Sequence, residues 1–242
     1  MRHLLFVLSI LILVVTACQP VTVTSAPTTL QPLSTTRAET SAPTSSPSET
    51  PFPLASATST LIPAGLIRVD TLAQEVYPFI ENGRCSLAEA IFAANSGEPK
   101  DSCAAGIPGE SIIELIPGEY RFTQRDQTPP QEDWVASTVE VGDALPIVSY
   151  SLTIRGNGAT LIRDETAEQF RFFEVMFGTL TLEDLTLQNG DVGEDWGGAI
   201  YAFNASLDLK GVRFVDNRAD NGGGIYLTLG ALSVQDSEFS GN

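Results

Sequence analysis

Apolar and polar residues alternate in three short stretches of the C-terminal half, and each stretch shifts its alternation by one residue near its middle. The stretches cover residues 180–187, 207–214 and 232–239, so they recur at a nearly constant spacing. A second motif, Gly-Gly-Ala-Ile-Tyr at 197–201, recurs as Gly-Gly-Gly-Ile-Tyr at 222–226, at the same spacing as the last two stretches. Two independent motifs that share one period indicate a repeat architecture.

Each stretch supplies strands of four or five residues with a single apolar face, which one strand cannot bury alone. If the chain coils so that each strand pairs with its copy one turn later, the apolar columns bury one another. The Gly pairs permit sharp corners between the faces of the coil, and a turn as long as this period fits three faces. The pattern therefore predicts an all-β fold, a parallel β-helix over residues 111–242, with a β-sandwich of short strands as the alternative.

Residues 64–110 have a helical pattern instead. Ser86 followed by Glu89 forms a capping box, and the apolar residues between 87 and 94 recur at helical spacing. Asn95-Ser96-Gly97 is a typical helix end. We therefore expect a short amphipathic helix here.

The N-terminus has the pattern of an export signal. Arg2 precedes an apolar run over residues 4–15, which is shorter than the roughly 20 residues that span a bilayer. Val15-Thr16-Ala17-Cys18 then resembles a bacterial lipobox, in which the Cys is acylated and becomes the new N-terminus. This resemblance implies that residues 1–17 are a lipoprotein signal peptide and that Cys18 anchors an extracytoplasmic, surface-displayed protein to a membrane. An ordinary signal peptide with a chance Cys is the alternative.

A Ser/Thr/Pro-rich segment follows the signal. Residues 19–63 contain 19 Ser or Thr and 8 Pro, without a Gly and without apolar periodicity. Such a composition cannot bury a core, so we expect residues 18–63 to form a disordered stalk.

Two cysteines remain after Cys18, namely Cys85 and Cys103. In an exported chain two such thiols usually pair, and closing this loop stabilises the fold by about 3 kcal/mol. We expect a disulfide that pins the helix, with two free buried thiols as the alternative.

The segment around the first of these cysteines is similar to a known domain. Cys85-Ser86-Leu87-Ala88-Glu89-Ala90 resembles the CSLREA domain, which is found at the start of exported bacterial β-helix proteins. The likeness extends over roughly residues 66–122 and implies that residues 64–110 form an N-terminal cap on the β-helix. Ala88 stands where the family has Arg, so any contact of that Arg is missing.

The repeats resemble a second family. Gly197-Gly198-Ala199-Ile200, followed by Phe214-Val215-Asp216-Asn217, is similar to the repeats of polymorphic outer-membrane proteins. The resemblance implies a right-handed, pectin-lyase-like parallel β-helix linked to adhesion and surface display. Asn217 and Asn242 match the Asn of that motif and are expected to stack as an amide ladder. Because the sequence stops inside the array, we favour a truncated gene or a fragment; pairing with another molecule or fraying are alternatives.

Charge and composition exclude several functions. The formal net charge is −17, with 30 acidic and 13 basic residues, which disfavours nucleic acid and electrostatic docking on an anionic membrane. The single His, His3, lies in the signal. A mature chain without His has no Ser-His-Asp triad and no His-ligated zinc.

Two sets of residues are candidate sites on the outside of the coil. Asp195 and Asp220 occupy matching positions on successive turns, where close like charges favour a cation. We therefore consider a Ca²⁺ site there, to which further acidic residues contribute, against solvated turn residues. The possible additional ligands are Asp191, Glu194 and Asp216.

Tyr201 and Tyr226 are one turn apart and should stack as an outward ladder, which either binds a ligand or is structural. Arg155 and Arg163 flank a turn, and we expect them to pair on the surface with Asp164 or Glu165. No catalytic residue set is evident.

Two functions from different classes remain. The first is a non-catalytic, lipid-anchored surface module that contacts carbohydrate or another surface protein. The alternative is a carbohydrate-active β-helix enzyme, a polysaccharide lyase or hydrolase that is incomplete in this chain. Fold alone does not decide between them.

Overall fold

The computed structural model describes residues 63–128 and 142–242. The predicted signal peptide, Cys18 and the stalk before residue 63 lie outside this part of the chain. Within it, no helix is both long enough and apolar enough to cross a membrane.

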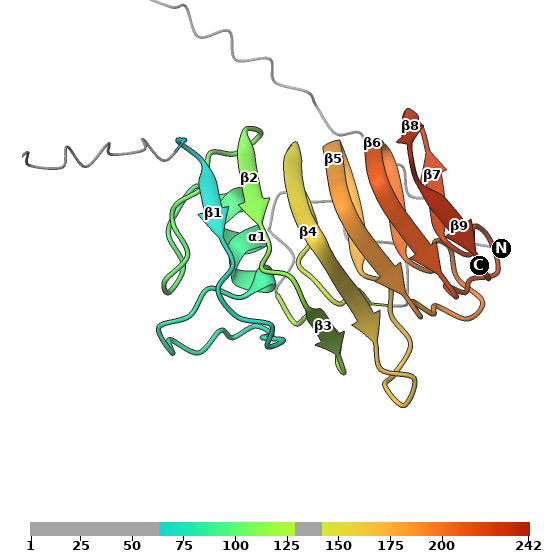
Figure 1. The fold of residues 1–242 in the computed structure, drawn as a ribbon, viewed down its shortest axis with the longest axis horizontal. Helices are drawn as coiled ribbons and strands as arrows, with labels where there is room; N and C mark the ends of the chain where they lie inside the picture. The colour runs from blue at the N-terminus through green and yellow to red at the C-terminus, as the bar shows by residue number, and fades with distance from the viewer. Residues whose placement is uncertain (1–62, 129–141) are drawn as a thin grey trace, which may run out of the picture. The chain divides into compact units, whose positions relative to one another are not determined.

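Nine strands and one helix make up the described residues (Figure 1). The helix α1 is Leu87–Ser96. The strands are β1 Leu66–Arg68, β2 Ser111–Glu114, β3 Glu119–Phe122, β4 Leu152–Arg163, β5 Phe173–Gln188, β6 Ile200–Val215, β7 Ile225–Thr228, β8 Leu232–Gln235 and β9 Glu238–Ser240.

All strand pairs are parallel, and each strand of the repeat pairs with its copy one turn later (Figure 1). The described strands therefore form a parallel β-helix, as the periodicity predicts. The Gly-Gly motif is in register as well, since Tyr201 lies opposite Tyr226. The chain completes three turns between the first and the last residue of one apolar column. This column consists of Leu152, Leu180, Leu207 and Leu232.

Each turn has three faces. β6 runs round all three, and the next turn divides the same path into β7, β8 and β9, which pair with successive parts of β6. The inward residues of these faces form the core, where Leu182 and Leu209 are fully buried. Each buried Leu contributes about 1.5–3 kcal/mol relative to an exposed one. The apolar half of the alternating pattern is thus the interior of the coil.

The corners between the faces consist of residues with a left-handed backbone, aligned from turn to turn by the strand register. The first corner column is Phe177, Asn204 and Leu229, with φ of 58°, 49° and 55°. Two further columns are Asp184, Gly211 and Asp236, and Asn189, Asp216 and Gly241. Asn, Asp and Gly adopt this conformation at little cost, whereas other residues lose roughly 1–2 kcal/mol. The Gly pairs identified in the sequence are therefore only some of the corners.

The helix α1 lies at the N-terminal end of the coil beside β1 and β2 (Figure 1). The predicted capping box is present, because Ser86 N donates to Glu89 Oε2 at 3.0 Å and Glu89 N donates to Ser86 Oγ at 3.3 Å. Gly97, with φ 74°, ends the helix. Asn95 then ties the helix to the segment before β4, since its Nδ2 donates to Ile147 O at 2.8 Å.

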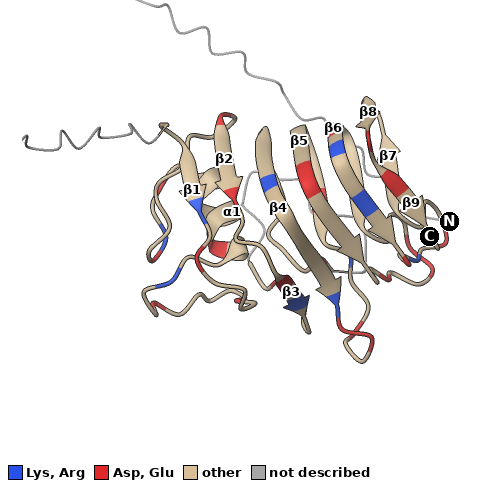
Figure 2. Ribbon diagram, in the orientation of Figure 1, with Lys and Arg blue, Asp and Glu red and all other residues tan. Residues whose placement is uncertain are grey.

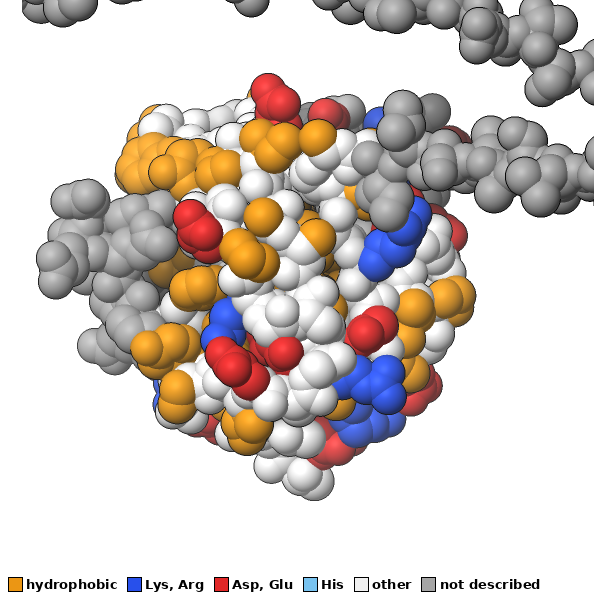
Figure 3. Space-filling view, turned by 90° about the vertical axis from the view of Figure 1, so that its left-hand side faces the viewer, with side chains coloured by type: hydrophobic (Ala, Val, Ile, Leu, Met, Phe, Trp, Pro, Cys, Tyr) orange, Lys and Arg blue, Asp and Glu red, His pale blue; other side chains and the backbone are white. Residues whose placement is uncertain are grey.

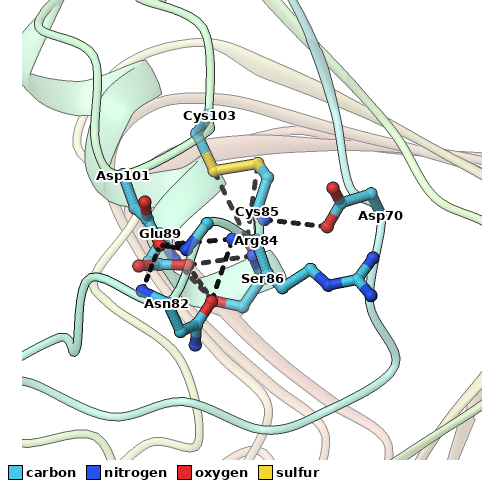
Figure 4. Close-up of a disulfide and its surroundings, with 9 residues drawn as sticks. Asp70, Asn82, Arg84, Cys85, Ser86, Glu89, Asp101 and Cys103 are labelled. Carbon is cyan, nitrogen blue, oxygen red and sulfur yellow. Dashed lines mark hydrogen bonds between the residues drawn. A yellow bond between two sulfur atoms is a disulfide. The ribbon is translucent and has the colours of Figure 1, made fainter.

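The predicted disulfide between Cys85 and Cys103 is present (Figure 4). Asp101 supports it by accepting hydrogen bonds from the backbone N–H groups of residues 82–84. Asp70 Oδ1 accepts from Cys85 N at 2.9 Å. The loop before α1 is thus held by one covalent bond and two carboxylates.

The two ends of the coil differ in exposure. At the end formed by β1 and α1, hydrophobic side chains lie in small groups among polar and charged ones (Figure 3). In the last turn, by contrast, Leu232, Val234 and Phe239 are 46–47% exposed, although the residues that they cover one turn earlier are at most 1% exposed. The last turn therefore buries only one side of its apolar columns.

Candidate functional site

An aromatic cluster forms on the outside of the coil, where the predicted tyrosine ladder stacks. The ring centroids of Tyr201 and Tyr226 are 5.8 Å apart with planes 7° from parallel, and Trp196 lies 5.2 Å from Tyr226. Below them, the guanidinium carbon of Arg171 is 5.3 Å from the Tyr201 centroid, a cation–π contact. Tyr226 thus stacks on both Tyr201 and the indole of Trp196, and the guanidinium of Arg171 lies against the ring of Tyr201.

Only part of this cluster is open to a ligand. Tyr201 is 6% exposed, because Tyr226 and Arg171 lie against its ring. Trp196 is 39% exposed, and Tyr226 is half-buried. The surface that the cluster presents therefore consists of Trp196 and Tyr226, which the sequence alone did not separate from Tyr201.

Two carboxyl groups contact the buried Arg171, and a third carboxyl group lies beside one of them. Its Nη2 donates to Asp195 Oδ2 at 3.0 Å. Its Nε lies 3.1 Å from Asp143 Oδ1, which is an ion-pair distance, but the contact lacks the alignment of a hydrogen bond and is therefore coulombic. The third carboxyl, Glu174, lies one turn below Tyr201 in register with it and is 1% exposed. The guanidinium and the three carboxyl groups thus form one largely enclosed cluster.

Burial raises the pKa of Asp143 well above that of an exposed aspartate, and the Glu174 carboxylate raises it further. The positive charge of Arg171 lowers this pKa in part. Burial also raises the pKa of Tyr201, and the nearby Glu174 charge acts in the same direction. The cluster consequently holds a proton on Asp143 at pH values at which exposed aspartates are ionised.

Two neighbouring carboxyl groups, one of which has a raised pKa, are an arrangement that enzymes use for acid–base catalysis. Access decides against that use here. The side chain of Asp143 is 11% exposed and that of Arg171 is fully buried, and Glu174 is equally enclosed. In this conformation the group is enclosed and does not present an acid and a base at the surface.

The structure places the backbones of Asp195 and Asp220 as predicted. Trp196 pairs with Asn221 on the next turn, and Asp220 N donates to Asp195 O at 3.0 Å. Their carboxylates, however, have different partners. Asp195 pairs with Arg171, whereas Asp220 Oδ2 accepts from Asn221 Nδ2 at 3.0 Å.

The other predicted Ca²⁺ ligands are dispersed. Asp191 pairs with Arg218 on the next turn and not with Asp216, and its Oδ1 accepts from Gly193 N at 2.8 Å. Glu194 and Asp216 are exposed. No group of three or more His, Cys, Asp or Glu suited to a metal ion occurs in residues 63–128 and 142–242. Calcium binding stays a prediction.

The expected partners of Arg155 are wrong. Arg155 lies between Glu114 and Glu183, at 3.4 Å from each, because the strand register places the three side chains in one column. This ionic ladder alternates in sign across β1, β2, β4, β5 and β6 (Figure 2). Its members are Arg68, Glu114, Arg155, Glu183 and Lys210.

Arg163 also differs from the expectation. It is 7% exposed, and it donates to backbone carbonyls, at 2.7 Å to Asn189 O and 3.0 Å to Ala167 O. Its guanidinium thus fixes the loop after β4 and does not form a surface ion pair with Asp164 or Glu165.

The predicted amide ladder is present. Asn217 Nδ2 donates to Asn242 Oδ1 at 2.8 Å and to Leu187 O at 3.0 Å. Asn217 Oδ1 accepts from Gly190 N at 2.9 Å. Because Asn217 is 1% exposed, these bonds satisfy polar groups that would otherwise be buried without partners.

Sequence reasoning missed the buried cluster of Asp143, Arg171 and Glu174. A signal for Glu174 exists, since it lies one repeat before Tyr201 and interrupts an apolar run. Asp143 has no repeat motif beside it, so only the structure brings it to Arg171.

These features define a class, a parallel β-helix with a helical, disulfide-bonded cap. Comparison of the chain with protein-family models, with curated proteins and with solved structures found no match. The resemblance of residues 66–122 to the CSLREA domain therefore stays a prediction.

Proposed function

We propose that this protein is a lipid-anchored, extracytoplasmic β-helix of a bacterial cell surface that contacts carbohydrate or another surface protein without catalysing a reaction. The lipobox at Cys18 and the Ser/Thr/Pro-rich segment support the anchor and the stalk. The disulfide between Cys85 and Cys103 fits an oxidising compartment outside the cytoplasm. The likeness of the cap to CSLREA domains points the same way.

The observation that supports a contact function is the partly exposed pair of Trp196 and Tyr226. Their stacked rings are held rigid by one another, so little side-chain entropy is lost when a ligand covers them. Flat aromatic surfaces suit the apolar faces of sugar rings as well as protein side chains. The acidic chain disfavours nucleic acid as the partner.

Binding of the full-length chain to a glycan panel tests this function. Cys18→Ser gives a form without the lipid site, and Trp196→Ala then removes the exposed indole. We expect the Cys18→Ser chain to bind at least one glycan, and we expect Trp196→Ala to weaken this binding while Trp196→Phe retains most of it. Equal glycan binding by the Cys18→Ser chain and by its Trp196→Ala and Trp196→Phe variants would show that the aromatic pair does not contribute to binding.

The anchor has its own test. We expect the wild-type chain to partition into the detergent phase and to have the mass of an acylated N-terminal Cys. The Cys18→Ser chain should lack the acyl mass, and it should remain in the aqueous phase once its apolar signal has been cleaved at another position. A wild-type chain without lipid would contradict the anchor and leave the binding function to be judged by the glycan panel.

A carbohydrate-active enzyme is the second candidate, and the pairing of Asp143 with Glu174 is the observation that favours it. The enclosure of both groups speaks against it. Incubating the protein with polysaccharides, with and without Ca²⁺, separates the two functions. New unsaturated or reducing ends that disappear in Asp143→Asn would establish an enzyme.

A further inference from the structure

A shallow groove of about 220 Å³ crosses three neighbouring strands, β2, β4 and β5, away from the aromatic cluster. Hydroxyl side chains line most of it, together with Glu110, Gly109 and the apolar Ile112 and Leu152. The hydroxyl residues are Ser111, Ser151, Thr153, Thr179 and Thr181.

Several of these hydroxyls are free to meet a ligand. Among the described residues, the hydroxyls of Thr153, Thr179 and Thr181 make no hydrogen bond, and all three residues are half-buried. Ser111 and Ser151 are engaged: Ser111 Oγ donates to Ile107 O at 2.9 Å, and Ser151 Oγ accepts from Thr179 N at 3.2 Å. The groove thus offers three unused donor–acceptor groups on a rigid sheet.

Two exposed aromatic residues lie on the corner that leads into this groove. Tyr150 directly precedes Ser151, and Phe177 lies two residues before Thr179. The pairings of Val148 with Val175 and of Leu152 with Leu180 put Tyr150 and Phe177 at the same corner of successive turns. They are 45% and 47% exposed in the middle of the coil, where turns exist on both sides.

The backbone conformation of Phe177 is unfavourable in addition to the exposure of its apolar side chain. Its φ of 58° is left-handed, a conformation that costs a residue such as Phe about 1–2 kcal/mol. The next turn has Asn204 at the same corner, a residue that adopts this conformation readily. An exposed, bulky apolar side chain in a strained conformation is a reason to look for a function.

The corner is also free of charge. Residues 149–151, 176–178 and 203–205 contain no charged side chain, although the chain has a net charge of −17. A polyanion such as nucleic acid, or an anionic membrane, would require Lys or Arg here. The only charge at the groove is the carboxylate of Glu110, which can accept hydrogen bonds from hydroxyl groups.

We propose that this groove, flanked by Tyr150 and Phe177, binds a segment of a neutral polysaccharide that runs across the strands. The apolar faces of the sugar rings pack on the two aromatic rings, and their hydroxyls bond to the threonines. The volume is below the about 300–1,000 Å³ of pockets that enclose a small ligand, so an open groove for part of a polymer is the better fit. This inference rests on the proposed carbohydrate contact and adds to it a second site and a ligand class.

The test measures the affinity of the full-length Cys18→Ser chain for soluble β-glucan and glucomannan, with polygalacturonate as the anionic counterpart. Phe177→Asn places at this corner the residue that the next turn already has there. We expect a loss of affinity for the neutral polymers of about tenfold, the scale of one aromatic contact, with an unchanged or higher melting temperature. Leu229→Asn is the matched control, because it makes the same change two turns further along the corner, and it should leave the affinity unchanged.

Thr153→Val with Thr181→Val should weaken binding as well, since both substitutions keep side-chain shape and remove hydroxyls.

Four results would overturn the inference. If Trp196→Ala abolishes binding and Phe177→Asn does not, the groove is excluded while the proposed function stands. Stronger binding to polygalacturonate would exclude a neutral ligand. A wild-type dimer that Phe177→Asn dissociates would make the corner a self-association contact. Absence of binding to every polymer would exclude both this site and a carbohydrate function.

Discussion

Two groups of charged side chains on successive turns of this coil lie in different surroundings. The ionic ladder from Arg68 to Lys210 is exposed and alternates in sign, so that each charge has an opposite neighbour one turn away. The cluster at Arg171 is buried and combines one guanidinium with the carboxyl groups of Asp143, Asp195 and Glu174. The same coil therefore carries an alternating column of charge at its surface and an enclosed cluster of charge elsewhere.

The difference shows how each column contributes to the fold. Exposed cross-strand ion pairs contribute little each, but the alternating ladder penalises a shift of register, since a slip would oppose like charges. The buried cluster has far larger energies at stake, because its charges have lost their hydration. We infer that the ladder specifies register and that the buried cluster determines how stability depends on pH.

The largest expected effect follows from removal of the buried cation. Arg171→Met removes the buried cation that pairs with Asp195 and Asp143, and we expect the free energy of unfolding to fall by about 3–5 kcal/mol. Arg155→Met, in the exposed ladder, should cost less than about 1 kcal/mol. Urea denaturation of the two variants measures both values, and equal losses would contradict the distinction between the columns.

A second effect concerns pH. Because the pKa of Asp143 is raised in the folded state, the folded chain binds more protons than the unfolded one, so its stability falls as the pH rises through that pKa. Asp143→Asn retains a neutral polar group at every pH, and we expect it to flatten this fall. Melting temperatures across a pH series give the comparison.

Asp164 is the matched control for the pH series. Hydrogen bonds from Thr166 lower its pKa, and the charge of Arg121 adds to this shift. Its contribution is therefore present at neutral pH and is lost as the pH falls through the lowered pKa. Asp164→Asn should alter the acid side of the profile only. If it also removes the fall at higher pH, Asp143 is not the titrating group.

The smallest effect concerns the sign pattern of the ladder. Arg155→Glu puts three carboxylates in register on β2, β4 and β5, which we expect to cost about 1 kcal/mol. Since these groups are exposed, 1 M salt should screen the repulsion and return the stability to that of Arg155→Met. The loss in Arg171→Met should persist in salt because its charges are buried.

The sequence predicts the columns of the coil well for a physical reason. Inward residues such as Leu180 and Leu207 are constrained by burial and repeat at one period. The capping box at Ser86 and the disulfide at Cys85 are local, so their patterns are complete within a short segment. Each of these features can therefore be predicted from a repeat or from a short segment of the sequence.

The candidate sites were harder to predict because they combine residues that share no pattern. Asp143 precedes the regular turns and meets Arg171 only through the coil. Phe177 occupies a corner where sequence rules expect Asn or Gly, so its left-handed backbone was not evident. The predicted partners of Arg155 were wrong because sequence neighbours were preferred over the register that brings Glu114 and Glu183 to it.

We infer that the charged columns maintain the coil, and we propose that its outer aromatic and hydroxyl surfaces contact carbohydrate. Hydrogen exchange of the full-length Cys18→Ser chain, with and without a saturating neutral glucan, tests this division most directly. We expect slower exchange on glucan binding at residues 149–153 and 177–181, together with the loop at Trp196, and no change beside Glu114 and Lys210. Slower exchange confined to the ionic ladder, or no change anywhere in the coil, would contradict the account.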